Sequence, residues 1–521
     1  MNEKQIIDVL VVGAGPVGLT LALDLARRGV NCRIIEQSPT SQIGTRGRGM
    51  SMRSQHVFED LGILEALLPY DEGMPPTRNY DHDILVNETN PSLGAQPVPP
   101  PYRPFLMINQ EQTEAVLRER LASFGRQVEF GTQLVSFTQE VEIVVANVTH
   151  AGQNEEIHAR YLVGSDGGRS TVRKAAGFSF LGETWDQEHF LLANLQVSGL
   201  DTDFSHNWGN MFDGGMTLIW MSHSSIWFLS ATIAPDEHGA FSAPSLETAQ
   251  RIFDERAGLP DVHFSHPRWL SIWRPSFRMV DRYRIGRIFL AGDAAHVHSA
   301  AGGQGMNTGV QDAYNLGWKL AHVLKNDASD SLLDTYQAER FPIAEGVLAA
   351  SSIRHRAFQH DMDQSLKTLL AGQETFADVT QLSLTYRGSR LSRDLDNATS
   401  IRAGDRAPDA LCVRAESSEQ VRLFDLFRGT HFTLLVFSDQ PIPPLPAAYE
   451  RSLHVYTIAR PDTSVENSNH ALVDSDGHAS RAYGITGDAL ILVRPDGYIG
   501  LTGGSHDQEL IIDYLRDVIG R

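Results

Sequence analysis

The N-terminal stretch from Val9 to Glu36 constrains the fold of this 521-residue chain more than any other part of the sequence. An apolar run ends at Val12, and the glycine-rich turn Gly13-Ala14-Gly15-Pro16-Val17-Gly18 then opens a segment with helical apolar spacing. A second apolar run follows and ends on Glu36. The pattern predicts a strand, a tight turn, a helix and a second, parallel strand, as in α/β folds that bind dinucleotides.

The spacing of the glycines and of the acid indicates what this unit binds. Gly13 allows a sharp turn, Gly15 allows close approach of the backbone to a pyrophosphate, and Gly18 allows close packing of the helix on the strand. The helix N-terminus presents free N–H groups to the phosphates. Glu36 lies 18 residues after Gly18, close to the roughly 20 expected of an acid that binds a ribose hydroxyl. This stretch alone leaves open whether the nucleotide is FAD or NAD(P).

Charge and composition narrow the class of protein. The formal net charge of −20 argues against a nucleic-acid partner. Asp24 interrupts the first apolar stretch before it could span a bilayer or act as a signal core, so we expect a cytoplasmic protein without a membrane span. Cys32 and Cys412 belong to no paired motif, and the histidines lack metal-ligand spacing. Neither a disulfide framework nor a metal site is therefore predicted.

Two further segments carry features of an anion-binding site. In the segment from Gly44 to Ser54, glycines alternate with arginines, which lets guanidinium groups reach an anion; a solvated basic loop is the alternative. The segment from Tyr161 to Ser170 predicts a strand that runs into a second glycine turn with Asp166 at its tip. Such a turn places an acid at the carboxyl end of a strand, where open α/β sheets bind ligands, although a plain strand-to-helix turn is also consistent with it.

A third glycine-rich segment follows much later in the chain. A predicted strand ends at Asp293, and a glycine loop then leads into a helix that begins near Met306 and runs to Leu324. The N-terminus of that helix would favour negative charge on a neighbouring group. A reduced flavin, whose pyrimidine end becomes anionic, is such a group.

Tryptophans are concentrated between residues 181 and 279, in short strand-like runs. These runs predict a mainly antiparallel sheet in a second domain. Trp220 and Trp227 flank a turn that carries His223. The two indoles are candidates for an apolar pocket that binds a flat ring, and the core on the other face of the sheet is the alternative. His223 is the only candidate for a catalytic base, against the alternative of a solvent-facing turn residue.

Together, the three glycine motifs resemble those of the single-component FAD-dependent aromatic hydroxylases, typified by para-hydroxybenzoate and phenol hydroxylases. The motifs are GAGPVG with Glu36, VGSDGGRSTVR, and GRIFLAGDAAH followed by GGQGMNTGVQDAYNLGWKLA, and the resemblance covers residues 5 to about 360. It implies an FAD-dependent monooxygenase that uses NADPH or NADH and O2 to hydroxylate a phenolic or other electron-rich aromatic substrate, through a flavin C4a-hydroperoxide. An oxygenase of polycyclic, antibiotic-like substrates, acting by hydroxylation or Baeyer-Villiger insertion, and a flavoprotein oxidase or electron-transfer protein remain as alternatives.

The resemblance also implies roles for particular residues. The first turn would hold the pyrophosphate, Glu36 the ribose, Asp166 both FAD and NAD(P)H, and Asp293 the ribityl chain. Arg46 resembles the arginine that lies along the flavin, and Gln110 the glutamine near the ribityl phosphate. The expected cofactor-binding set is completed by Pro16, Val17, Gln37, Leu134, Gly303, Gly305, Met306 and Asn307. The family usually has a proline where this chain has Ala300, beside the flavin and the substrate.

The resemblance further implies a division of the chain. An α/β FAD-binding domain of the glutathione reductase type would take residues 1–75, 105–180 and 280–390. The substrate-binding sheet would take 76–104 and 181–279. Residues 395–521 resemble an appended thioredoxin-like domain. Because this domain has no Cys-x-x-Cys motif, we expect a structural or dimer-forming role rather than a redox role.

Overall fold

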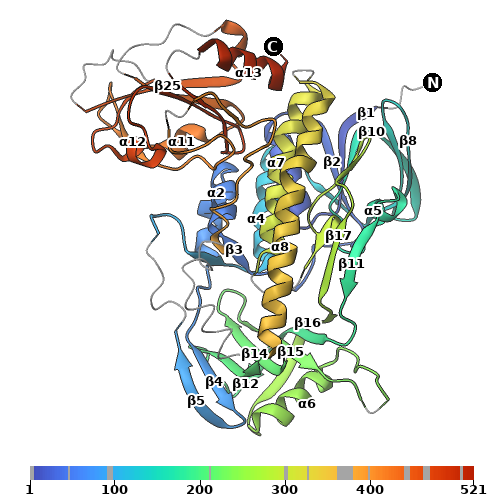
Figure 1. Cartoon of the computed structure of the whole chain (residues 1–521). Coiled ribbons are helices and arrows are strands. Elements are labelled where there is room, and N and C mark those ends of the chain that lie inside the picture. The colour runs from blue at the N-terminus through green and yellow to red at the C-terminus, as the bar shows by residue number, and fades with distance from the viewer. Residues whose placement is uncertain are drawn as a thin grey trace.

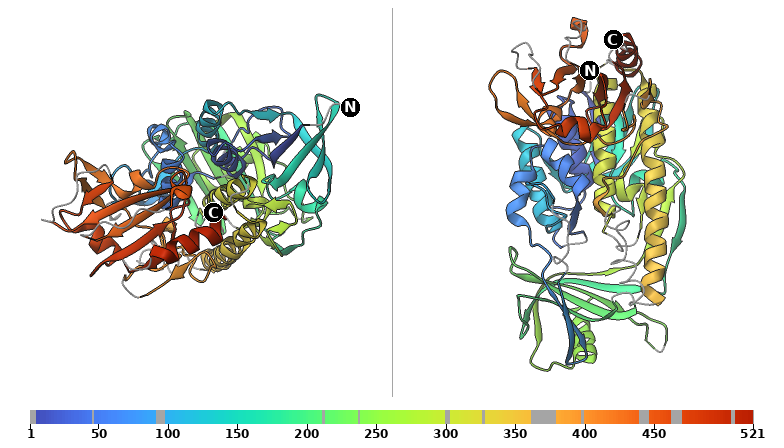
Figure 2. Two further views of the ribbon diagram at one scale, coloured as in Figure 1. Left: turned by 90° about the horizontal axis from the view of Figure 1, so that it is seen from above. Right: turned by 60° about the vertical axis from the view of Figure 1, so that its left-hand side comes forward.

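The computed structural model describes residues 5–44, 47–90, 98–210, 213–236, 238–298, 303–325, 328–360, 379–396, 399–438, 446–461, 470–504 and 508–520. The sheet that has seven strands lies at one end of the molecule (Figure 1). The N-terminal sheet and the C-terminal sheet lie side by side at the other end, and the long helix α8 (Asp334–His360) runs between the two ends (Figure 1, Figure 2).

The N-terminal sheet begins with the predicted βαβ unit, formed by β1 (Ile6–Val12), α1 (Pro16–Arg27) and β2 (Cys32–Glu36). Strand β1 pairs in parallel with both β2 and the end of β10 (Gln153–Gly164). The central strands are almost fully buried, as expected of a parallel sheet covered on both faces. The rest of the sheet comprises β7 (Val128–Phe130), β8 (Thr132–Gln139), β9 (Val144–His150), β18 (Arg284–Ile285) and β19 (Ile288–Leu290).

Helices α1 and α7 (Gly305–Leu324) pack closely against each other. A Cβ atom added at Gly309 would lie 2.6 Å from Cγ2 of Val17, so only glycine permits this approach. The helical region between residues 52 and 67 is divided into two helices, because Gly62 takes a positive φ of 73° between them. The remaining elements of this region are β3 (Gly49–Ser51), α2 (Met52–Asp60), α3 (Leu64–Leu67), η1 (Leu68–Tyr70), β6 (Phe105–Met107), α4 (Gln110–Ser123) and α5 (Thr171–Ala175).

The seven-stranded sheet is antiparallel except for one parallel pair, β13 with β4. One face packs on α6 (Leu246–Ala257), through a core that includes Leu229 and Phe253. Figure 2 shows this sheet between α6 and the N-terminal domain. In spatial order its strands are β16 (His263–Trp273), β12 (His189–Ser198), β15 (Ile226–Ile233), β14 (Asp213–Met221), β13 (Ser205–Asn210), β4 (Thr77–Asp81) and β5 (Ile84–Thr89).

A small three-stranded sheet links the two larger ones. It consists of β11 (Phe180–Thr184), β17 (Ser276–Val280) and β20 (His296–Val297). Strand β20 follows the loop at η2 (Gly292–Ala294) directly, so this sheet connects the third glycine motif to strands β11 and β17, which adjoin the seven-stranded sheet in sequence.

The C-terminal part has a mixed sheet and a core of its own. Strand β24 (Phe432–Phe437) is parallel to β25 (Leu453–Ala459) and antiparallel to β27 (Ala489–Val493). Its other elements are β21 (Arg393–Asp394), β22 (Leu411–Arg414), β23 (Gln420–Arg422), α11 (Leu423–Phe427), η4 (Ala447–Tyr449), β26 (Ala471–Val473), α12 (His478–Tyr483), β28 (Ile499–Gly503) and α13 (Gln508–Ile519). Among the described helices, none combines the length and the apolar character needed to cross a membrane.

Candidate active site

The three glycine motifs, far apart in sequence, meet at the carboxyl edge of the parallel strands. A Cβ atom added at Gly13 would lie 2.5 Å from the carbonyl oxygen of Ser165, in the second motif. Val17 of the first motif packs against Gly292 and Gly309 of the third, where added Cβ atoms would lie 2.8 and 2.6 Å from its Cγ2. The sheet edge is therefore built from all three motifs at once, at the position where α/β sheets bind ligands.

The N-terminus of α1 has the properties of a phosphate site. Its N-cap is Gly15, and no side chain of the described residues caps it. A Cβ atom added at Gly15 would find no atom within 4 Å, whereas one at Gly18 would lie 2.0 Å from the carbonyl oxygen of Gly13. Gly18 is thus required by internal packing, and Gly15 faces open space. Free N–H groups beside open space at a helix N-terminus fit the pyrophosphate of a dinucleotide.

Glu36 is held beside this turn at the end of β2. Its carboxylate accepts hydrogen bonds of 3.0 Å from the backbone N–H groups of Ala14 and Ser38. A carboxylate has about four acceptor positions, so two bonds leave capacity for ribose hydroxyls. Gln37 follows directly and is exposed.

Gln110 begins α4 and does not point freely toward a ligand. Its Nε2 donates to the Glu114 carboxylate at 2.8 Å. Burial raises the pKa of Glu114 to about 7, while Gln110 and Arg118 oppose this shift and Glu36 adds to it. Glu114 is an acid that the sequence reasoning did not single out, and its charge is coupled to that of the expected ribose ligand.

Asp166 caps the short helix α5. Its carboxylate accepts hydrogen bonds from the backbone N–H groups of Thr171 and Val172, at 2.7 and 3.2 Å, and from the Ser170 hydroxyl at 2.5 Å. Burial raises the pKa of Asp166 in spite of these bonds. The structure thus places Asp166 in the strand-to-helix turn that the sequence left as an alternative, and a direct role toward FAD or NAD(P)H stays a prediction.

The third motif places Asp293 and the N-terminus of α7 at the same edge. Asp293 is exposed in the short turn η2, directly after β19. The N-cap of α7 is Gln304, again without a side-chain cap among the described residues. Gly303, Gly305 and Met306 lie in this loop and first turn. Two uncapped helix N-termini therefore converge on one edge of the sheet.

Asn307 fastens this loop to β3. Its Nδ2 donates to the carbonyl oxygens of Gly49 and Gly303, at 2.9 and 2.8 Å, and its Oδ1 accepts from the backbone N–H of Ser51 at 2.9 Å. Every polar atom of the side chain is engaged with backbone. Asn307 thus fixes the start of α7 against β3, within the glycine- and arginine-rich segment.

A buried charge network, which the sequence reasoning missed, supports the same loop from behind. Asp312 accepts hydrogen bonds from the backbone N–H of Gly292 (3.1 Å), from His296 Nε2 (2.8 Å) and from Arg340 Nε (2.8 Å). Burial alone would raise the pKa of Asp312, but Arg340 and His296 hold it below its usual value. Asp312 and Arg340 lie 28 positions apart on two helices, and no motif in the sequence links them.

One face of the seven-stranded sheet turns toward these motifs. Asn194 lies directly opposite Trp269 on one side and Phe228 on the other, so the three side chains share a face. A Cβ atom added at Gly44 would lie 2.4 Å from the Trp269 ring, and the Arg48 guanidinium lies over the Phe228 ring, 5.8 Å from its centroid. This face, rather than its opposite, is therefore the one that contacts the segment from Gly44 to Arg48.

The prediction that Trp220 and Trp227 line a substrate pocket is corrected by the register. The two residues lie directly opposite each other on β14 and β15, on the face that packs against α6. Trp227 is only 1% exposed in that core. Adjacent residues of a strand point to opposite faces, so it is Phe228, one position later, that turns toward the N-terminal domain.

His223 lies on the exposed turn between β14 and β15, as its alternative stated. Its backbone N–H donates to Glu72, and its ring lies 6.0 Å from that of Tyr70.

Leu134, which was expected in the cofactor-binding set, is a buried residue of β8, opposite Val148. Arg46 and Ala300 lie outside the described residues.

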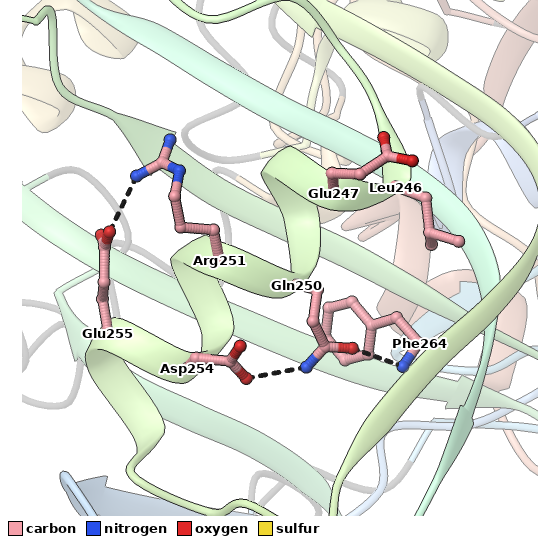
Figure 3. A pocket seen from close by; sticks show the side chains of 7 residues that line it. All are labelled: Leu246, Glu247, Gln250, Arg251, Asp254, Glu255 and Phe264. Carbon is pink, nitrogen blue, oxygen red and sulfur yellow. Dashed lines mark hydrogen bonds and ion pairs between the residues drawn. The ribbon is translucent and has the colours of Figure 1, made fainter.

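A shallow hollow on α6, shown in Figure 3, is remote from these motifs. Gln250 donates to Asp254 and accepts from the backbone N–H of Phe264 (Figure 3). Its polar groups thus bind one another, on the side of the sheet that faces away from the glycine motifs. In the described parts of the chain, no group of three or more His, Cys, Asp or Glu side chains is placed to hold a metal ion.

The fold and the sheet edge together define a dinucleotide-binding α/β protein in which a second sheet closes over the nucleotide site. A family model described as "FAD binding domain" matches residues 6–351, and one described as "Aromatic-ring hydroxylase, C-terminal" matches residues 400–521.

Proteins of known class are similar over the whole length. A flavin-dependent monooxygenase of Mycobacteroides abscessus is 40% identical, over 98% of this chain and 100% of the relative. Pentachlorophenol 4-monooxygenase of Sphingobium chlorophenolicum is 33% identical, over 98% and 97%. The solved structure of aklavinone-11 hydroxylase in a ternary complex with FAD and aklavinone matches with a TM-score of 0.80 and 25% identity, covering 100% of both chains.

The chain belongs to the FAD-binding-domain family of aromatic-ring hydroxylases, and the protein is an FAD-dependent aromatic monooxygenase with NAD(P)H as co-substrate. The expected α/β FAD-binding fold with mixed sheets is confirmed, as is the expected cofactor. The residues present fit FAD: an uncapped helix N-terminus with an open Gly15 for the pyrophosphate, and Glu36 for the ribose.

Proposed function

We propose that the enzyme hydroxylates a phenolic or other electron-rich aromatic ring, held between the loop at the start of α7 and the sheet face that carries Trp269 and Phe228. The observation that supports this most is the convergence of the three glycine motifs opposite that face. The FAD, once reduced by NAD(P)H, supplies the activation of O2. Aromatic walls would keep water from the site of oxygen transfer.

The roles of the protein's own residues follow from their positions. The turn at Gly15 and the Glu36 carboxylate bind the nucleotide end of FAD, and Asp293 binds the ribityl chain. Asn307 holds the loop around the isoalloxazine ring through its three backbone bonds. Asp312 keeps the backbone of Gly292, next to Asp293, in place.

The division into three domains is also part of the proposal. The separate sheets support it, although Tyr102, in the segment assigned to the substrate sheet, donates its hydroxyl to Glu59 of α2 and so lies against the N-terminal domain. A thioredoxin-like C-terminal domain is supported by the strand order β28-β27-β24-β25, with β24 and β25 parallel and the other pairs antiparallel. We further propose a cytoplasmic protein in which this domain contributes to a homodimer.

A panel of phenols tests the proposed function. The purified protein should be yellow and should oxidise NADH or NADPH, and it should do so faster with at least one phenol of a panel that includes multi-ring compounds. The mass of the product should increase by one oxygen atom. If no phenol changed the rate, and all reducing equivalents appeared as hydrogen peroxide, the proposal would fail.

The relatives' names, monooxygenase and hydroxylase, do not favour the alternative of a flavoprotein without oxygen transfer. Product mass separates this alternative directly, because an oxidase leaves the phenol unchanged.

A further inference from the structure

Arg48 is a buried cation near the start of α7, and two of its guanidinium nitrogens have no hydrogen-bond partner among the described residues. Its residue exposure is 8%, which excludes the solvated loop that the sequence left open for this position. Within the described part of the chain, Nε and Nη2 are buried and make no hydrogen bond. Burial lowers the pKa of Arg48 to about 10, partly offset by Glu72. The side chain therefore remains cationic at neutral pH.

The nearby Glu72 carboxylate does not pair with the Arg48 guanidinium. The Glu72 carboxylate accepts hydrogen bonds from the backbone N–H groups of Ser222 and His223, and from the Ser222 hydroxyl at 2.6 Å. Glu72 thus holds the β14–β15 turn, and it forms no ion pair of 4 Å or less with Arg48 among the described residues. Burying a charge without a partner costs free energy. Binding of an anion at Arg48 would offset that cost.

The backbone around Arg48 is fixed to the loop at the start of α7, residues 303–306, which we call the flavin loop. Its carbonyl oxygen accepts from the backbone N–H of Ile108 at 2.8 Å. The preceding Gly47 is next to Met306, with an added Cβ atom 3.7 Å from the Met306 Cβ. The following Gly49 accepts the hydrogen bond from Asn307. Arg48 is thus held on both sides by the first turn of α7.

The side chain of Arg48, in contrast, reaches β15 of the seven-stranded sheet. The guanidinium lies over the ring of Phe228, on the face that also carries Trp269 and Asn194. The pyrophosphate site at α1 belongs to a different element, which makes a substrate group the better match for this cation than a phosphate of FAD.

We propose that the Arg48 guanidinium binds the hydroxyl oxygen of the aromatic substrate in its ionised form and holds the ring as a phenolate beside the flavin loop. The substrate O–H bond breaks, the electron pair stays on oxygen, and the proton leaves to solvent. A neighbouring positive charge favours the ionised phenol, and a phenolate ring is richer in electrons than a phenol ring. Arg48 would then set both the position of the ring and its reactivity.

This inference rests on the proposed function, because it needs an ionisable aromatic substrate. The test uses holoenzyme with FAD bound and a series of para-substituted and multi-ring phenols, and it compares wild type with Arg48→Gln and Arg48→Lys. The control is Arg53→Gln, because Arg53 is also buried, close in sequence, and engaged with the backbone oxygen of Asp496 at 2.6 Å.

For Arg48→Gln we expect the phenol KM to rise about 10-fold or more, as for the loss of a hydrogen bond to a charged group. The pH above which kcat/KM reaches its plateau should also move upward, by about one unit or more. Arg48→Lys should restore most of the pH effect, since it restores the charge. Arg53→Gln should leave the phenol KM and the pH profile unchanged.

Three outcomes separate the possibilities. If no phenol stimulates wild type, the proposed function fails and this inference falls with it. If phenols stimulate wild type but Arg48→Gln keeps its KM and pH profile, the inference is overturned and the proposed function stands. If Arg48→Gln instead changes the FAD reduction potential without phenol, while the phenol KM is unchanged, Arg48 serves the flavin and the inference is again overturned.

Folding of the variant is a second, independent readout. Because Nε and Nη2 of Arg48 have no hydrogen-bond partner among the described residues, Arg48→Gln should unfold at the same temperature as wild type or higher. A clear loss of stability together with an unchanged KM would assign Arg48 a structural role instead.

Discussion

Two polar regions at the opposite ends of α7 differ in how their charges are satisfied. At its C-terminal end, Lys319, Glu339, Arg494 and Asp496 form a fully buried cluster with bond lengths of 2.5 to 2.7 Å, which joins α7 and α8 to the C-terminal domain. At its N-terminal end, two helix N-termini are uncapped and Arg48 lacks a partner among the described residues. Buried polar groups in proteins are usually paired. The difference therefore indicates that the cluster at the C-terminal end of α7 has a structural role and that the region at its N-terminal end binds ligands.

The largest effect is expected in the paired cluster. Arg494→Met removes the cation that binds both Glu339 and Asp496 and leaves two buried carboxylates with one lysine. We expect a loss of about 3–5 kcal/mol in the free energy of unfolding, measured by chemical denaturation. Arg48→Met is the matched control at the unpaired end, where no loss is expected. Equal losses in both variants would break the comparison.

The next effect concerns Glu114, which lies behind the nucleotide site. Its pKa rises from about 4.3 when unfolded to about 7 when folded. The stability that Glu114 contributes is therefore fully present below the unfolded pKa and is lost as the pH rises through about 7, by at most about 4 kcal/mol.

Glu114→Gln should remove this slope when denaturation is followed between pH 5 and about 8. The control is Glu111→Gln, because Glu111 lies on the same helical turn but its side chain is 40% exposed. An unchanged slope in Glu114→Gln would show that the acid is not buried as described.

The two glycines of the first turn should differ in stability. An added methyl at Gly18 would overlap the Gly13 carbonyl oxygen, and we expect Gly18→Ala to lower the free energy of unfolding of the FAD-free protein by about 1–3 kcal/mol. Gly15→Ala meets open space and should leave it nearly unchanged. Denaturation of both variants side by side gives the answer, and similar losses would refute the distinction.

The smallest expected effect is at Asp293. Asp293→Ala should weaken FAD binding about 10-fold or more, because the ribityl hydroxyls would lose a charged hydrogen-bond acceptor on the protein. Titration with FAD, followed by flavin fluorescence, measures it. Asp186→Ala is the control, since the carboxylate of Asp186 forms an exposed ion pair with Arg274, which contributes little. FAD affinity equal to that of wild type would count against the placement of the ribityl chain.

The sequence predicted the nucleotide half of the site because its information is local. A strand, a glycine turn and an acid at fixed spacing specify one βαβ unit, and the structure reproduces it with β1, α1 and β2. Asp166 shows the limit of this reasoning. A turn with an acid at its tip is equally suited to cap a helix, and its carboxylate does cap α5.

The substrate half could not be predicted, because it depends on register and on distant partners. For Trp220 and Trp227 the sequence left both a substrate pocket and the core open, since both faces of β14 and β15 carry apolar side chains and periodicity does not say which face meets which domain. The segment that contains Arg48 was left open between an anion-binding loop and a solvated basic loop. The buried side chain of Arg48 packs over Phe228, 180 positions away in the chain.

The central claim is that the uncapped N-termini of α1 and α7 bind FAD. Titration of the Gly15→Ala variant with FAD tests it most directly. The account predicts an FAD affinity at least about 10-fold below that of wild type, since an added methyl would occupy the space expected for the pyrophosphate, with the unfolding of the FAD-free protein unchanged. Wild-type FAD affinity in this variant would contradict the claim.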